Sequence, residues 1–160
     1  MLTNADIQRI ALQQSAWDCN CSPEDFLRPD SLVTLSQKHP NARKYLSLPF
    51  TCDLVSYGNN IVAQTSPELA APGGENIRKY PTEHCFETPH LHALDDLLRP
   101  YGQKVCFMAE YFLPDVEKLA ALPCPYELRI LHQADFADLY LPQWSDALCE
   151  KRKELDVLGV

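Results

Sequence analysis

Two prolines within Leu122-Pro-Cys-Pro125 impose the firmest limit on how this chain can fold. Proline lacks a backbone N–H and fixes φ, and the residue before it avoids the helical region. The preceding helix is therefore not expected to continue through this tetrapeptide, which should follow an extended path. The chain before it is long enough to bury a core of its own, whereas the chain after it is short. We expect a first domain over residues 1–124 and a partial second domain over residues 125–160.

Helix signals occur at the start of the first domain and again in its second half. Thr3 or Asn4 can cap a helix over residues 5–17, and Asp6 suits the first turn of that helix. Residues 88–98 predict a second helix, because leucines recur there at helical spacing. The expected buried stripe of the first helix consists of Ile7, Ile10, Ala11 and Trp17.

Strand signals lie between and after these helices. Residues 32–35 predict one strand, and residues 50–57 and 61–65 predict a hairpin across Gly58-Asn-Asn60, a sequence that tolerates positive φ. Residues 105–112 are almost entirely apolar, which is typical of a central strand covered on both faces. The fold class predicted for this domain is α+β, a mixed sheet with packed helices.

Two shorter helices complete the prediction for the first domain. Ser66-Pro67 has the sequence of a helix start, and Pro72-Gly-Gly74 is expected to end that helix. Another short helix is expected over residues 113–121.

The second part of the chain has a strand, helix, helix, strand order. Residues 126–131 alternate as in a strand with one covered face. Apolar residues then recur at helical spacing on either side of Pro142, so two helices are expected before a second strand begins at residues 157–160.

This second part resembles the beginning of a GNAT N-acetyltransferase domain. The stretches Cys106-Phe-Met-Ala-Glu-Tyr-Phe-Leu-Pro-Asp115 and Trp144-Ser-Asp-Ala-Leu-Cys-Glu-Lys-Arg-Lys-Glu-Leu-Asp156 resemble a group of two-part GNAT proteins of Firmicutes. The resemblance implies an enzyme in which a small amine attacks the thioester of acetyl-CoA. Backbone N–H groups would stabilise the oxyanion, and a general base would accept the amine proton.

The chain departs from this family at the acetyl-CoA site. GNAT enzymes hold the pyrophosphate on a Gln/Arg-x-x-Gly-x-Gly/Ala loop at a helix N-terminus. None of the five glycines lies in such a pattern. We therefore expect the N-terminal part of an acetyltransferase, truncated before the loop and inactive alone, with acetyl-CoA bound only by a full-length parent. The five glycines are Gly58, Gly73, Gly74, Gly102 and Gly159.

The resemblance also implies an acceptor site. In GNAT enzymes the first two helices and their connection wall the amine pocket, and Tyr140, Trp144 and Glu150 fall in that region. These three residues are the candidate substrate-binding residues, and no catalytic or metal-binding residue is assigned. A second interpretation stays open, in which the two aromatic residues belong to the core and Glu150 is a solvated charge.

Charge and composition limit the classes of partner and the compartment expected for this chain. The net charge of −8 disfavours nucleic acid and anionic membranes, and no apolar run reaches the length of a membrane span. Seven scattered cysteines and the lack of a secretory signal favour reduced thiols in a cytoplasmic protein. A second function class is a non-catalytic ligand-binding or dimerisation module, a homodimer pairing through strand 157–160.

Three further features are weighed as sites. His84, Cys85, His90 and His92 are the densest set of potential metal or thiol-enzyme residues, although residues two apart in a helix face different ways. Cys19-Asn-Cys21 lacks the CxxC redox spacing. Glu110 interrupts the apolar run over 105–112, so it is either partly buried or marks the end of the strand.

Overall fold

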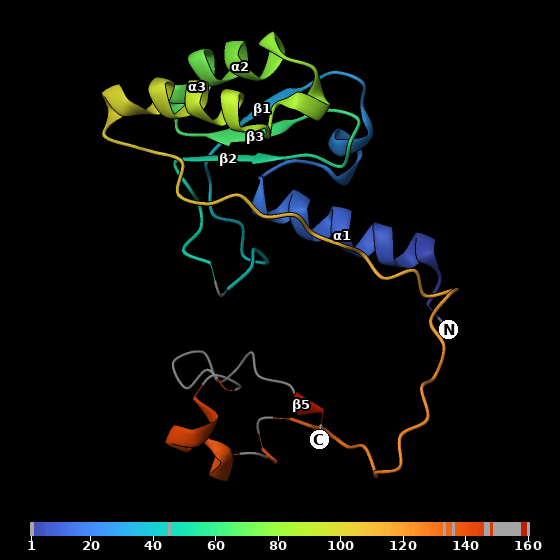
Figure 1. The fold of residues 1–160 in the computed structure, drawn as a ribbon. Coiled ribbons are helices and arrows are strands. Elements are labelled where there is room, and N and C mark those ends of the chain that lie inside the picture. The colour runs from blue at the N-terminus through green and yellow to red at the C-terminus, as the bar shows by residue number, and fades with distance from the viewer. Residues whose placement is uncertain are drawn as a thin grey trace. The chain divides into compact units, whose positions relative to one another are not determined.

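The structure is a computed structural model that describes residues 2–44, 46–132, 134–135, 137–145, 148 and 158–159. The chain divides into two compact units, unit 1 over Met1–Leu119 and unit 2 over Ala120–Val160. The fold is mixed α+β, as predicted, with a small three-stranded sheet in unit 1 (Figure 1). Among the described residues, no helix has both the length and the apolar character needed to cross a membrane.

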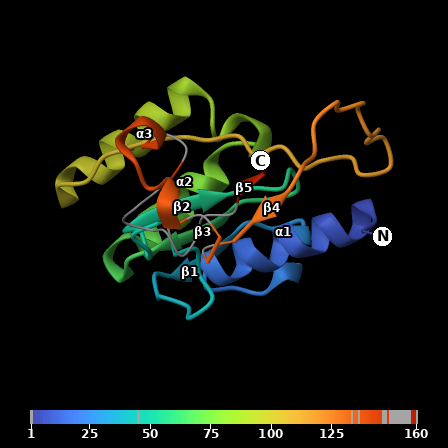
Figure 2. The same cartoon turned by 90° about the horizontal axis from the view of Figure 1, so that it is seen from below.

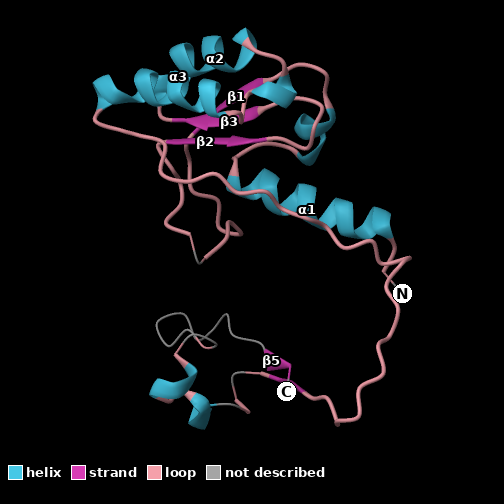
Figure 3. Ribbon diagram, viewed as in Figure 1, coloured by secondary structure: helices cyan, strands magenta, loops and turns pink. Residues whose placement is uncertain are grey.

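The sheet of unit 1 consists of β1, Leu32–Leu35, β2, Cys52–Val55, and β3, Val62–Thr65. Its order is β1-β3-β2, with β1 parallel and β2 antiparallel to β3 (Figure 3). The predicted hairpin is confirmed, and Gly58 takes a φ of 99° in its turn, a conformation that glycine adopts without steric cost.

Helices cover both faces of this sheet (Figures 1 and 2). α1, Asn4–Asp18, lies on one face, whereas α2, Ala70–Lys79, and α3, Thr88–Leu98, lie on the other. Successive residues here point to opposite faces of the sheet, so Val62 packs with α1 while Ala63, and Ile61 just before β3, pack with α2. Short 3₁₀ turns complete unit 1: η1 Pro23–Leu27, η2 Pro67–Leu69, η3 Thr82–His84 and η4 Arg99–Tyr101.

α1 begins where the sequence predicts. The Thr3 hydroxyl accepts from the Asp6 N–H and the Asp6 carboxylate accepts from the Thr3 N–H, which makes a capping box. The predicted buried stripe was wrong, since Ile10 is 51% exposed. Leu12 and Ala16 are buried instead, because they face Phe26 and the sheet.

α2 runs through Pro72-Gly-Gly74, where the sequence predicted its end. Pro72 lies in the first turn, where a missing N–H costs little. A Cβ on Gly73 would lie 3.4 Å from the Thr65 methyl, and one on Gly74 would lie 3.1 Å from a Val33 methyl. The glycines therefore let α2 approach the sheet closely.

Residues 103–116, called the strap below, do not form the predicted central strand or start the helix predicted over 113–121. They run extended and unpaired within unit 1, and Phe112 is 88% exposed. Glu110 is also exposed and ends no strand. The central position of the sheet belongs to β3, which already has a partner on each side.

In unit 2, β4, Ile130–Leu131, pairs antiparallel with β5, Leu158–Gly159. The predicted strand over 126–131 is shorter than expected, and Tyr126 is 79% exposed. Between the strands lie two 3₁₀ turns, η5, Ala137–Leu139, and η6, Pro142–Trp144. The rest of the second predicted helix falls outside the described residues.

Candidate functional site

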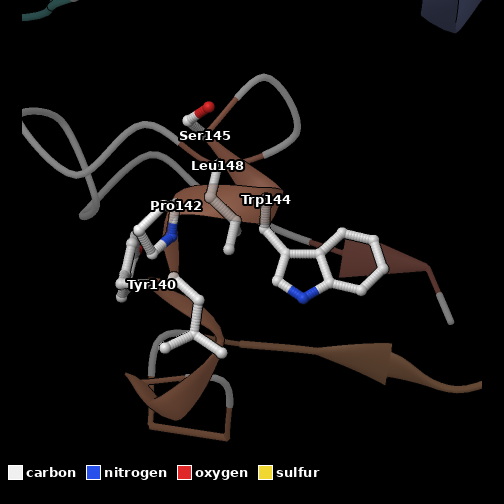
Figure 4. A pocket seen from close by; sticks show the side chains of 6 residues that line it. Tyr140, Pro142, Trp144, Ser145 and Leu148 are labelled. Carbon is white, nitrogen blue, oxygen red and sulfur yellow. The ribbon is translucent and has the colours of Figure 1, made fainter.

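A small pocket in unit 2 collects two of the three candidate acceptor residues. Its volume is about 260 Å³, and both Tyr140 and Trp144 line it. In Figure 4 the Trp144 indole lies on one side of the hollow and Tyr140 and Pro142 on the other. Glu150, the third candidate, lies outside the described residues. The full lining is Tyr140, Leu141, Pro142, Trp144, Ser145 and Leu148.

Local backbone structure builds this pocket. Leu141 is extended, and Pro142 starts η6 at a position that needs no N–H donor. The N–H of Trp144 donates to the Leu141 carbonyl at 2.9 Å, and the N–H of Leu148 donates to the Trp144 carbonyl at 3.0 Å. These hydrogen bonds accompany the placement of the indole and the buried Leu148 on the same hollow.

The chemistry of the pocket is that of a binding surface. No lining side chain carries a charge, so the walls offer rings and aliphatic groups plus the Tyr140 and Ser145 hydroxyls and the indole N–H. Trp144 is 49% exposed, so part of its surface is accessible to a ligand. Such a surface suits the apolar part of a small molecule, and an accessible indole suits a cation.

The four glycines that the structure describes in unit 1 do not provide a pyrophosphate site for acetyl-CoA. Gly58 and Gly102 lie in turns with positive φ, and Gly73 and Gly74 lie inside α2 against side chains of the sheet. None of these four glycines belongs to a loop whose N–H groups converge at a helix start, as a pyrophosphate requires.

The histidine and cysteine group is not brought together as a metal site. His84 Nδ1 contacts a Glu87 carboxylate oxygen at 2.8 Å, and His90 Nδ1 contacts the His84 carbonyl oxygen. The Cys85 thiol is buried against the Ile77 and Tyr80 carbonyls. His92 is exposed. Among the described residues, no three side chains of the His, Cys, Asp and Glu type are grouped to hold a metal.

Unit 1 contains a polar cluster that the sequence did not predict. Thr34, Gln64 and Asp53 lie side by side across β1, β3 and β2. They face the end of α1, where the carbonyl groups of Asp18 and its C-cap residue Cys19 accept side-chain hydrogen bonds. Gln64 Nε2 donates to the Asp18 carbonyl at 2.9 Å, and the Thr34 hydroxyl donates to the Cys19 carbonyl at 2.7 Å. The sheet therefore caps the C-terminus of this helix.

Buried charge surrounds this cap. The Asp18 carboxylate accepts from Arg43 Nε and, at 2.8 Å, from the Arg43 backbone N–H. Desolvation raises the pKa of Asp53; the Arg43 charge opposes that shift and the Asp18 charge adds to it. Asp18 and Arg43 stand 25 positions apart, and no local sequence signal joins them. The contacts of the cluster are those of a structural cap.

A larger open hollow of about 650 Å³ runs along α1 and η1. Trp17 and Leu27 contribute apolar surface to it, and Gln13, Arg9 and Glu24 contribute polar groups. The Trp17 ring stacks on His39 with a centroid separation of 5.9 Å, which fixes one wall.

Comparisons of the chain with protein-family models, with curated proteins and with solved structures found no match. Any function assigned to either hollow therefore comes from the residues themselves and from the resemblance described above.

Proposed function

We propose that this chain is the N-terminal part of an acetyl-CoA-dependent N-acetyltransferase and contributes the wall that holds the acceptor amine. The observation that carries the proposal is the pocket of Tyr140 and Trp144, whose residues lie in the sequence between two paired antiparallel strands, β4 and β5. The resemblance to GNAT proteins implies an amine site in this strand, helix, helix, strand segment. The compartment that goes with this proposal is the cytoplasm.

In this role the pocket walls hold the carbon skeleton of the amine while its ammonium group stays close to the indole face. A cation over an indole is stabilised by the ring quadrupole. Glu150 is the carboxylate that the sequence offers to the same ammonium group. The acceptor class is therefore a small primary amine with an apolar skeleton.

Binding is tested by titrating phenethylamine while following the fluorescence of Trp144. The other tryptophan is removed by Trp17→Phe, so the signal belongs to the pocket. We expect saturable quenching that Tyr140→Ala weakens and that Tyr126→Ala, which changes an exposed tyrosine outside the pocket, leaves unchanged. Glu150→Gln should weaken binding of phenethylamine but not of 2-phenylethanol, since only the amine carries a charge.

Catalysis is tested separately by measuring transfer of labelled acetyl groups from acetyl-CoA to phenethylamine. Because the Gly-rich loop is not among residues 1–160, we expect no turnover. Sustained turnover by this chain would contradict the proposal. An affinity for phenethylamine that does not change when Tyr140 or Trp144 is substituted would contradict it as well.

A second candidate function is ligand binding by residues 1–124. The open hollow along α1 favours it, because the hollow combines apolar and polar walls beside the fixed Trp17 ring. Fluorescence of Trp17 in a Trp144→Phe variant distinguishes the two candidates, since each tryptophan reports on one hollow.

A further inference from the structure

The strap leaves its backbone open to a partner. From residue 106 to residue 114, no backbone N–H or carbonyl is hydrogen-bonded to the backbone of another described residue. Figure 1 shows this stretch as a drawn-out ribbon without helical turns, and its backbone groups lack backbone partners, as those of an edge strand do. Such groups are satisfied when another extended chain pairs with them.

Contacts at both ends hold the strap in place. The Val105 N–H donates to the Asp95 carboxylate at 2.7 Å. At the other end, Asn4 Nδ2 donates to Asp115 at 2.8 Å, and the Val116 N–H donates to the Asn4 side-chain oxygen at 2.8 Å. Because these contacts fix the extended shape in advance, a pairing strand pays less ordering entropy on binding.

Between residues 106 and 113 the exposed side chains of the strap are apolar, with the exception of Glu110. Phe107 is 55% exposed, Tyr111 70% and Phe112 88%. Taking about 200 Å² for a whole aromatic side chain, these rings expose roughly 400 Å². Met108 and Leu113, each about half exposed, extend the patch. In an edge-to-edge strand pair these side chains alternate between two faces, so two straps would bury part of this area together with their paired backbone. The interface would therefore lie at or below the lower end of specific interfaces.

We infer that residues 105–113 pair antiparallel with the same residues of a second copy of this chain, with Ala109 opposite its own counterpart. In this register Phe107 lies opposite Tyr111, which gives two equivalent aromatic pairs across the two-fold axis. Val105 lies opposite Leu113 on the same face, so that face is apolar throughout.

The charges of the strap agree with this register. Glu110 lies opposite Met108 and not opposite the second Glu110, which would be roughly 7–8 Å away on the diagonal. Because each copy carries a net charge of −8, the two copies repel each other and the dimer is weak, with a dissociation constant on the order of micromolar. Higher ionic strength should therefore tighten it.

The first test is sedimentation velocity of the full chain from about 1 to 200 µM, a range that spans micromolar affinities. We expect a concentration-dependent dimer. Phe112→Ser should weaken it by about tenfold or more, since the change occurs twice per dimer. Leu122→Ser, which changes a leucine that is 85% exposed outside the strap, is the matched control and should have no effect. Glu110→Gln should tighten the dimer several-fold.

The second test fixes the register by disulfide formation. Directly opposed Cβ atoms lie about 4.5–5.5 Å apart, so Ala109→Cys should give a 109–109 cross-link under mild oxidation. The native Cys106 is an internal control, because the two copies of Cys106 would lie roughly 20 Å apart along the strands. Peptide mapping by mass spectrometry identifies the bonded pair.

Three results would overturn the inference. The first is a chain that stays monomeric throughout that concentration range even with Glu110→Gln, which would leave the strap for a strand of some other molecule. The second is a dimer that Phe112→Ser does not weaken, since its interface would lie elsewhere. The third is a Cys106–Cys106 cross-link in place of the 109–109 one, because it requires another register.

Discussion

Segments 61–65 and 105–113 of unit 1 are both rich in apolar residues, yet their surroundings are opposite. Ile61, Val62 and Ala63 are fully buried between α1 and α2. Phe112 and Tyr111 in the strap are mostly exposed. The difference arises from the partners that the chain provides, because the first segment has strands on both sides and helices on both faces. Apolar character alone therefore does not identify a central strand.

The largest expected contrast between the two regions is in thiol reactivity. Cys106 in the strap is exposed, whereas desolvation raises the pKa of Cys52, in β2 beside β3, to about 12. Only the thiolate reacts, and burial both suppresses the Cys52 thiolate and shields it from the reagent. The exposed thiol of Cys106 should therefore react with a maleimide roughly 10²–10³-fold faster. Peptide mapping over time measures both rates at pH 8. Comparable rates would mean that the sheet opens as readily as the strap.

Truncation of side chains should separate the same regions by stability. Ile61→Ala removes buried methyl groups from between the layers and should lower the free energy of unfolding by about 2–5 kcal/mol. Met108→Ala changes a side chain that is 51% exposed, so its effect should stay within about 0.5 kcal/mol. Urea titration followed by circular dichroism at a protein concentration below dimerisation checks both. A large loss in Met108→Ala would show that the strap contributes to the folded core.

The glycines of α2 test the packing of the buried region further, because they determine how closely α2 approaches the sheet. Gly73→Ala should stabilise unit 1 by up to about 1 kcal/mol, since alanine favours helix and its Cβ would make an ordinary contact with Thr65. Gly74→Ala gains the same propensity but brings its Cβ to 3.1 Å from Val33 and 3.0 Å from Arg78. It should be the less stable variant by about 1 kcal/mol. Equal stabilities would mean that the β-branched Val33 moves aside without cost.

These contrasts indicate what the sequence can predict. α1, α3 and the hairpin were predictable because their signals are local: a capping residue, leucines at helical spacing, and a glycine at the turn. The course of α2 was not, because the need for glycine there arises from its distance to β1 and β3. The strap was mistaken for a central strand because strand propensity carries no information about which partner is present.

The same limit applies to the candidate sites. Tyr140 and Trp144 lie four positions apart, which is close enough for sequence to suggest a common surface, and the structure places both on one pocket. Their role in binding an amine stays a prediction. The Asp18, Arg43 and Gln64 contacts join residues far apart in sequence, so no local pattern announces them.

The smallest expected effect concerns Asp53, whose neighbour in β3 is Gln64. Desolvation raises the pKa of Asp53 above its unfolded value, so folding favours the protonated carboxyl. The corresponding stability is fully present below the unfolded pKa and is lost as pH rises through the folded pKa. Asp53→Asn cannot ionise. It should therefore be more stable than the parent chain at pH 7, with a difference that shrinks as pH falls toward 4.

Urea midpoints of both proteins between pH 4 and 7 measure this difference. Asp18→Asn is the informative comparison, because its carboxylate accepts from Arg43 and its loss should destabilise at neutral pH. If Asp53→Asn were also destabilising at pH 7, the Arg43 charge would outweigh the desolvation of Asp53. Asp18, Arg43 and Asp53 would then stabilise the fold as one charge network, and the Asp53 carboxylate would not be a destabilising member of it. The strap, whose exposed Glu110 faces solvent in the monomer, offers the matched substitution Glu110→Gln, for which no change in unfolding midpoint is expected.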